Sequence, residues 1–140
     1  MPYLDTSVLV CALTNEAQTS RMQDWLGAQA AGELVISPWV VTEFSAALSI
    51  KVRRQEFGPE HRAAALSAFT RLSAESFVSL PISEREFQTA ARFADQASLG
   101  LRAGDALHLA VAADHGIMLA TLDRRLAEAG AALGVATTLL

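Results

Sequence analysis

Short apolar segments alternate with longer segments of helical periodicity along this chain. The apolar segments have the length of buried strands and are flanked by residues that break regular structure. We therefore expect strands at residues 3–4, 34–36, 77–80, 117–120 and 135–139, and long helices at residues 16–31, 38–55, 59–76, 83–99 and 103–115. Strands that alternate with helices predict an α/β fold, with a mostly parallel sheet of about five strands covered by helices on both faces.

The boundaries of these helices carry recognisable signals. Ser37 followed by Pro38 suits an N-cap and the first helical position. Gly58, Gly100 and Gly116 are placed to end the helices before them. No repeat, linker or low-complexity tract interrupts the pattern, and 140 residues suit one core. We therefore expect a single domain over residues 1–140.

The composition limits the compartment and the chemistry. With Cys11 as its only cysteine, the chain has no internal disulfide and no cysteine-based zinc site. Its longest apolar stretch, residues 8–13, is far shorter than the roughly 20 residues of a membrane span. No basic segment of a secretory signal precedes that stretch, because Asp5 comes before any Lys or Arg. We therefore expect a cytoplasmic protein with no membrane contact.

Four acidic residues fall where an open parallel sheet binds its ligands, beyond the carboxyl ends of its strands. Asp5 directly follows the first expected strand, and Asp123 follows the fourth. Glu43 lies in the second turn of the helix after the second strand, on a face that it shares with apolar residues. Asp105 opens the helix at residues 103–115, also toward apolar surroundings.

Each of these acids also has a purely local explanation. Asp5 and Asp123 suit N-caps of the short helices that follow them, and Asp105 suits a first-turn acid stabilised by the helix dipole. Glu43 on an apolar face needs a partner, and an arginine would serve, because buried charges are usually paired.

Taken together, the four carboxylates predict a metal site. Carboxylates that converge on one edge of a sheet repel each other and cannot all stay ionised without positive charge among them. Ligation by oxygen alone suits Mg²⁺ or Mn²⁺, whereas the three histidines, at positions 61, 108 and 115, lack the spacing of a zinc site. Such clusters align a phosphodiester, generate hydroxide from water and stabilise the leaving oxygen.

The overall charge argues against binding to nucleic acid by bulk electrostatics, but only weakly. The formal net charge is −4, whereas nucleic-acid-binding domains usually have a pI above about 9. Setting the four acids aside, however, leaves 11 of the 15 acidic residues against 11 basic ones. If two divalent cations bind the four acids, the rest of the surface is neutral, and a nucleic-acid substrate becomes compatible with the composition.

Four short motifs follow one another along nearly the whole chain. They are Asp5-Thr6-Ser7-Val8-Leu9, Thr42-Glu43-Phe44, the segment Leu-Arg-Ala-Gly-Asp-Ala-Leu-His-Leu-Ala at residues 101–110, and Ala120-Thr121-Leu122-Asp123. In order and spacing they resemble the motifs of the PIN-domain nucleases. Within that family, the length of the chain and the order of its motifs are similar to those of the VapC-type ribonuclease toxins of bacterial toxin–antitoxin pairs.

The resemblance implies a three-layer α/β/α sandwich and an endoribonuclease that depends on Mg²⁺ or Mn²⁺. It also implies an RNA substrate, a cognate antitoxin protein as partner, and a homodimer. Many relatives have an aromatic residue where this chain has Leu126, a difference that affects packing more than chemistry. The catalytic and metal-ligating residues would correspond to Asp5, Glu43, Asp105 and Asp123, and two hydroxyl residues that support them would correspond to Ser7 and Thr121.

Three arginines lie close in sequence to two of these acids. We expect Arg102, Arg124 and Arg125 at the mouth of the site, where they either contact RNA phosphates or remain solvated. His108 is interpreted as a core or supporting histidine rather than a general base, because a divalent metal can activate water without one.

The helices expected at residues 38–55 and 59–76 form a hairpin with apolar residues on more than one side. Such a surplus suits a protein interface, and in the toxin family the equivalent region commonly receives the antitoxin. The aromatic residues are spread along the chain without the clustered stacking platform of single-strand binders. The apolar residues of the hairpin include Val40, Val41, Phe44, Leu48, Val52, Leu66, Phe69 and Leu72.

Two other classes of function stay open on the sequence alone. A receiver-like or phosphatase domain would use Asp5 as a phosphoryl acceptor, although no second Asp lies two residues after it and Lys51 is the only lysine. A catalytically silent binding partner would use the four acids as helix caps alone.

Overall fold

Five short strands, all parallel, form one sheet in the order β3-β2-β1-β4-β5. In the computed structural model, which describes residues 1–140, Tyr3 of the central strand β1 lies opposite Val35 of β2 and Leu119 of β4. The prediction of a mostly parallel sheet of about five strands is confirmed, and the sheet is parallel throughout. The strands are β1 (Tyr3–Leu4), β2 (Leu34–Ile36), β3 (Phe77–Ser79), β4 (Leu119–Thr121) and β5 (Thr137–Leu139).

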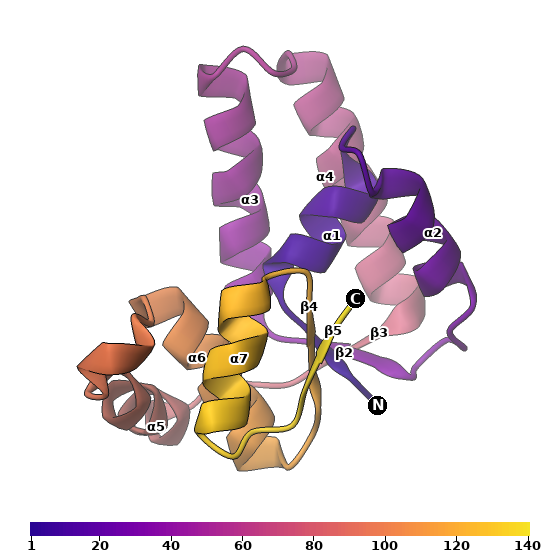
Figure 1. Ribbon diagram of the computed structural model, residues 1–140. Coiled ribbons are helices and arrows are strands. Elements are labelled where there is room, and N and C mark those ends of the chain that lie inside the picture. Colours follow the sequence, from indigo (N-terminus) through magenta and orange to yellow (C-terminus); the bar gives the residue numbers. More distant parts are fainter.

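Helices cover both faces of this sheet and complete the three-layer α/β/α arrangement (Figure 1). The sheet grows in one direction from β1 to β3 and in the other from β4 to β5, so right-handed crossovers place α1 to α4 on one face and α5 to α7 on the other. None of these helices is both long enough and apolar enough to cross a membrane. The helices are α1 (Thr6–Leu13), α2 (Thr19–Gly27), α3 (Pro38–Arg53), α4 (Pro59–Ser76), α5 (Glu84–Ala94), α6 (Ala103–His115) and α7 (Arg124–Ala132).

Two of the long helices expected from the sequence are shorter in the structure. The segment at residues 16–31 reduces to α2, because the Thr19 hydroxyl donates to the carbonyl oxygen of Cys11 (2.7 Å) and ties the preceding turn to α1. The segment at residues 83–99 divides into α5 and a short 3₁₀ helix, Ala97–Leu99. The contact of Thr19, which periodicity does not report, bears on the start of α2.

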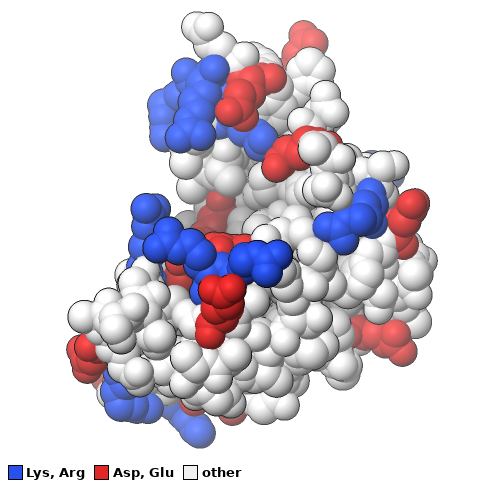
Figure 2. Space-filling model, viewed as in Figure 1, with Lys and Arg blue, Asp and Glu red and all other residues white.

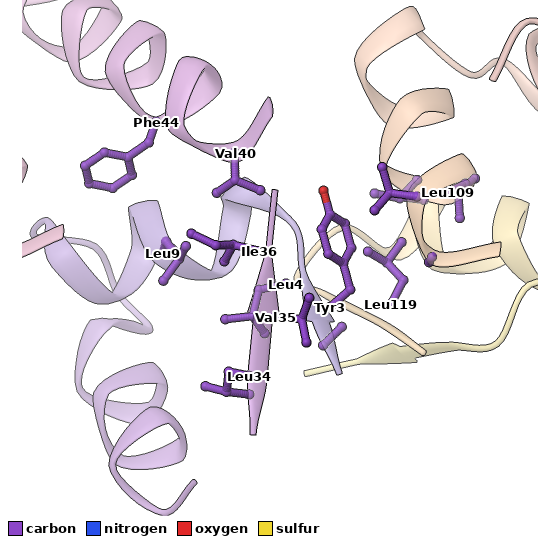
Figure 3. Close-up of a cluster of buried hydrophobic side chains, with 14 of the residues drawn as sticks. Tyr3, Leu4, Leu9, Leu34, Val35, Ile36, Val40, Phe44, Leu109 and Leu119 are labelled. Atoms are coloured by element: carbon purple, nitrogen blue, oxygen red, sulfur yellow. The ribbon is translucent and has the colours of Figure 1, made fainter. Parts of the chain in front are cut away.

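The core fills both faces of the central strands. Tyr3 and Leu4 of β1 are fully buried, together with Leu9 of α1, Phe44 of α3 and Leu109 of α6. Figure 3 shows Leu9 and Phe44 on one side of the strands and Leu109 on the other. Burial of a large apolar side chain contributes roughly 1.5–3 kcal/mol to the stability of the fold. The buried Tyr3 and Leu4 therefore hold β1 in place and, with it, the residues that directly follow the strand.

Helices α3 and α4 form a hairpin that projects beyond the sheet (Figure 1). Phe44 of α3 stacks on Phe69 of α4 with ring centroids 4.4 Å apart, and this contact closes the inner face of the hairpin. Val41 and Ile50 of α3 stay exposed, at 46% and 38%. The predicted hairpin is therefore confirmed, and part of its apolar surface faces outward.

Candidate functional site

The order of the strands reverses between β1 and β4, which are neighbours in the sheet but far apart in the chain. At such a switch point the loops that follow the two strands diverge to opposite faces and leave a crevice where α/β proteins bind their ligands. Asp5 is the first residue after β1, and Asp123 follows β4 by two residues. The topology therefore brings these two carboxylates, which are 118 positions apart in sequence, to one place.

The Asp5 carboxylate is buried and held by hydroxyl groups on both oxygens. Its Oδ1 accepts from the Ser7 N–H (3.1 Å) and the Ser7 hydroxyl (2.5 Å), and its Oδ2 accepts from the Thr121 hydroxyl (2.6 Å). Burial raises the pKa of Asp5, against the opposing effects of Ser7, Thr121 and the charge of His108. Asp5 is thus the N-cap of α1, as the local explanation expects, and Ser7 and Thr121 both contact it.

Asp123 is the N-cap of α7 and is tied to Asp5 through Thr121. Its Oδ1 accepts from the backbone N–H groups of Arg125 (2.9 Å) and Leu126 (3.3 Å). Its own N–H donates to the Thr121 hydroxyl (2.9 Å), which in turn donates to Asp5. One buried hydroxyl therefore sets the relative position of the two carboxylates at the switch point.

Glu43 reaches the same crevice from α3, and its partner is a histidine. Glu43 Oε1 accepts from the Thr6 hydroxyl (2.6 Å) and is bonded to His108 Nε2, while its side chain stays 29% exposed. Burial on its own would raise the pKa of Glu43, but the hydrogen bond and charge of His108, together with Thr6, lower it. The arginine partner of the local explanation is not the one found, because a buried histidine of α6 supplies the donor instead.

Asp105 lies in the first turn of α6 and faces the other three acids. Burial raises its pKa, and the negative charges of Asp123, Glu43 and Asp5 raise it further, against the charge of His108. The four carboxylates thus act on one another electrostatically. This is the mutual repulsion that makes positive charge among them favourable.

Two adjoining hollows contain these groups. The first, about 370 Å³, is lined by all four carboxylates together with Thr6, Ser7 and His108. The second, about 540 Å³, shares Glu43, Asp105 and Asp123 with it and adds Trp39 and two arginines. Figure 2 shows acidic atoms deep in a hollow below the α3–α4 hairpin, with basic side chains beside it. Because they share three acids, we call the two hollows together the acidic cleft.

The three arginines noted in the sequence do not stay together. Arg102 and Arg125 line the acidic cleft. Arg124 instead lines a separate depression with Cys11 and Arg21, on the other side of the turn after β4. The structure therefore brings two of the three to the mouth of the cleft and places the third elsewhere.

The donor chemistry of the acidic cleft fits a hard divalent cation. The side chains in it that could ligate a metal are carboxylates, which suit Mg²⁺ and Mn²⁺, apart from His108, whose two ring nitrogens are occupied by Tyr3 and Glu43. In the metal-free protein no three acidic, histidine or cysteine side chains converge closely enough to form a ready-made ligand set. Asp5 and Glu43 are held by hydroxyl groups of the protein instead.

Sequence reasoning assigned no role in the cleft to Tyr3, Thr6 or Gly104, and it interpreted His108 only as a core or supporting histidine. Thr6 and His108 fix Glu43, and Tyr3 in turn fixes His108. Gly104 leaves room for Glu43, since a Cβ at that position would stand 2.8 Å from Glu43 Oε2 and 3.3 Å from Cζ2 of Trp39. The only signal in the sequence was the presence of Thr6, Gly104 and His108 inside the motifs that carry the acids, and Tyr3 lies outside those motifs.

Known proteins agree with this fold and with these motifs. The PIN domain family model matches residues 3–132. No protein of curated function matches the chain in sequence. Among solved structures, FitAcB from Neisseria gonorrhoeae is 20% identical, with 98% of this chain and 96% of that chain covered and a TM-score of 0.70.

Two further structures cover almost the whole chain. VapC20 of Mycobacterium tuberculosis, described as a Sarcin-Ricin loop cleaving toxin, is 19% identical over 93% of this chain and 95% of that chain, with a TM-score of 0.72. VapBC2 from Rickettsia felis, bound to a DNA fragment from its promoter, is 15% identical over 100% and 99%, with a TM-score of 0.66.

A parallel α/β/α sandwich with acidic residues gathered at its switch point defines the class of this protein. The match over residues 3–132 goes further. The chain belongs to the PIN domain family, and the resemblance seen in its four motifs is confirmed.

Proposed function

We propose that the protein is a metal-dependent endoribonuclease that hydrolyses RNA phosphodiester bonds in the acidic cleft. The observation that carries the proposal is the gathering of four carboxylates, from the ends of β1 and β4 and from α3 and α6, around one hollow in a PIN domain. Asp5, Glu43, Asp105 and Asp123 are the residues that would hold Mg²⁺ or Mn²⁺. When bound, the metal supplies the activation of water and the neutralisation of charge on the phosphate.

The residues around the acids have distinct tasks in this proposal. Ser7 and Thr121 hold the two oxygens of Asp5, and the backbone of α7 holds one oxygen of Asp123. The raised pKa of Asp105 means that cation binding competes with a proton there. Arg102 and Arg125 line the same cleft and are placed to contact phosphates on either side of the reacting one.

We also propose that the protein is the toxin of a toxin–antitoxin pair. We assign it to the cytoplasm, which contains its RNA substrate and whose reducing conditions suit a free cysteine such as Cys11. The support comes from the solved relatives, one described as a toxin and another as a VapBC complex. The α3–α4 hairpin, on which apolar residues such as Val41 stay exposed, is the region that we assign to a cognate antitoxin. A homodimer is proposed on the family resemblance.

The test is cleavage of a mixed pool of structured RNA by the purified full chain with Mg²⁺, with Mn²⁺ and with a chelator. Asp5→Asn should abolish cleavage, because it removes the carboxylate at the centre of the cleft. Asp24→Asn makes the same chemical change at an exposed position of α2 and should leave cleavage intact. Cleavage that persists in the chelator, or in Asp5→Asn, would contradict the proposal.

The phosphoryl-acceptor alternative loses support in the structure. Lys51, the only lysine, forms ion pairs with Glu16 (3.4 Å) and Glu56 (3.3 Å) and is not among the residues that line the cleft beside Asp5. A receiver-like site would need that cation next to the acceptor carboxylate. Failure of a phosphate analogue to label Asp5 is therefore expected.

A further inference from the structure

A buried chain of hydrogen bonds leads from the centre of the sheet to Glu43. Tyr3 Oη on β1 lies 2.8 Å from Ser37 Oγ and 2.8 Å from His108 Nδ1. The other ring nitrogen of His108, Nε2, is bonded to Glu43 Oε1. Tyr3 and Ser37 are fully buried and His108 is 2% exposed. Three buried polar side chains in a core require a reason, because each one is costly unless its partners are in place.

The Tyr3 hydroxyl serves His108 in either protonation state of the imidazole. A phenol hydroxyl can donate one hydrogen bond and accept another at the same time, and the Tyr3 hydroxyl lies within reach of both Ser37 and His108. If the ring is neutral, Tyr3 donates to Nδ1 and accepts from Ser37, and the proton of the ring is on Nε2. If the ring is charged, Nδ1 donates to Tyr3, which then donates to Ser37. In both cases Nε2–H donates to Glu43.

Glu43 therefore has one carboxylate oxygen, Oε1, that accepts hydrogen bonds from the protein, and a second oxygen, Oε2, that is available to a ligand. Thr6 also donates to Oε1 (2.6 Å), so both donors reach the same oxygen of Glu43. Oε2 lies beside Gly104. Glycine has no Cβ and therefore leaves space for this oxygen. Glu43 lines both hollows of the acidic cleft.

We propose that Tyr3 and His108 are positioning residues, which hold Glu43 through Oε1 so that Oε2 faces the acidic cleft as a ligand. The inference rests on the proposed function, because the ligand role of Glu43 belongs to it. Groups that hold a metal ligand from behind typically change metal affinity or activity 10- to 100-fold when removed. A histidine that only fills the core would change stability without changing the affinity.

Two substitutions of His108 separate these roles. His108→Gln keeps an amide N–H that can reach Glu43, whereas His108→Leu fills a similar volume and has no donor. We expect Mn²⁺ affinity, measured by calorimetry on the full chain without RNA, to fall about 10- to 100-fold in His108→Leu and to be largely retained in His108→Gln. Equal affinities in the two variants, whether both match the wild type or both are lost, would overturn the proposal.

Tyr3→Phe keeps the packing of the ring and tests the same chain of hydrogen bonds if His108→Leu does not fold. We expect a lower kcat for RNA with an unchanged KM, because the arginines that we assign to phosphate binding are untouched. An unchanged kcat in folded Tyr3→Phe would overturn the role of Tyr3.

The state of the imidazole can be measured without metal or RNA. In ¹⁵N spectra of the metal-free protein we expect a proton on His108 Nε2, because that nitrogen faces Glu43 Oε1. A neutral ring protonated on Nδ1 alone would overturn the proposal, because Glu43 would then receive no donor from His108.

These outcomes distinguish failure of the positioning role from failure of the nuclease assignment. If the wild type binds Mn²⁺ and cleaves RNA but His108→Leu matches it, only the positioning role is overturned. If neither the wild type nor any variant binds Mn²⁺ at a site that Asp5→Asn removes, both are overturned.

Discussion

Thr121 offers the most direct test of how the two carboxylates at the switch point are held. Its hydroxyl is fully buried, donates to Asp5 Oδ2 (2.6 Å) and accepts from the Asp123 N–H (2.9 Å). Thr121→Val keeps the shape of the side chain and removes only this hydroxyl. It therefore breaks two hydrogen bonds and creates no cavity larger than the lost oxygen.

The magnitude follows from the partners that are left behind. Asp5 loses a hydrogen bond to a charged group, typically worth about 1.5–3 kcal/mol, and an unsatisfied buried donor costs about 1–3 kcal/mol. Asp5 keeps both bonds from Ser7, and Asp123 lies at the surface where water can replace the hydroxyl. The lower ends of both ranges therefore apply. We expect the free energy of unfolding to fall by about 2–3 kcal/mol, a large share of the 5–15 kcal/mol typical of a domain.

The loss should depend on pH in a defined direction. Burial raises the pKa of Asp5 in the folded state, so the folded protein binds more protons than the unfolded chain between the two pKa values. Ionisation of Asp5 therefore costs stability, and the cost develops as the pH rises through the folded pKa. Thr121 lowers that pKa, so its removal makes the cost larger. The effect of Thr121→Val should be greatest near neutral pH and smaller in acid, where Asp5 is protonated.

Urea unfolding of the metal-free protein over a series of pH values measures both effects. Thr70→Val is the matched control, because the Thr70 hydroxyl is exposed and donates only to the carbonyl oxygen of Leu66 (2.9 Å). A surface change of that kind should alter stability by no more than about 0.5 kcal/mol. A Thr121→Val variant as stable as this control, or one whose loss is the same at every pH, would refute the reasoning.

Three further predictions concern the acidic cleft. Gly104→Ala would place a Cβ 2.8 Å from Glu43 Oε2. We therefore expect a folded protein whose Mn²⁺ affinity, measured by calorimetry, is weaker than that of the wild type. Unchanged affinity would contradict this prediction. Asp105→Asn removes a carboxyl whose pKa is raised by burial and by its acidic neighbours. We expect the metal-free variant to resist urea better than the wild type near neutral pH and to lose RNA cleavage. A less stable variant would refute the electrostatic argument. Arg102→Ala should weaken RNA binding and reduce the slope of log affinity against log salt by about 0.7, whereas Arg124→Ala, in a separate depression, should leave the slope as it is.

Much of the fold was predictable because its signals are local. Most of the strands are short apolar segments between breakers, although β5 is Thr-Thr-Leu, and alternation with helices favours parallel strands and crossovers. Pro38 and Pro59 begin α3 and α4, and Gly116 ends α6 in the left-handed conformation (φ 64°). The helix expected at residues 16–31 was wrong at both ends, and at its start Thr19 bonds back to α1, a contact on which periodicity carries no information.

The positions of the four acids were predictable, whereas their partners were not. Strand ends and the switch point place Asp5 and Asp123 from the order of the elements alone. The partner of Glu43, however, is His108, which is 65 positions away on a helix of the opposite layer. A single sequence records that such a carboxylate needs a donor, but only the three-dimensional fold, which brings Glu43 of α3 to His108 of α6, decides which residue supplies it.

The local and the functional explanations of the acids turn out not to compete. Asp5 and Asp123 are N-caps of α1 and α7, and each lines the acidic cleft as well. The backbone N–H groups that a cap satisfies are rigid and point toward the start of the helix, so they hold a carboxylate at a fixed place without using a cation. In the metal-free protein, hydrogen bonds to such N–H groups and to hydroxyls offset much of the repulsion among the acids. We therefore expect the fold to persist when metal is removed. Acids that only capped helices would make stability independent of metal, whereas acids that only bound metal would make the fold depend on it. Circular dichroism with and without chelator would measure this, and unfolding in chelator would show that the caps do not suffice.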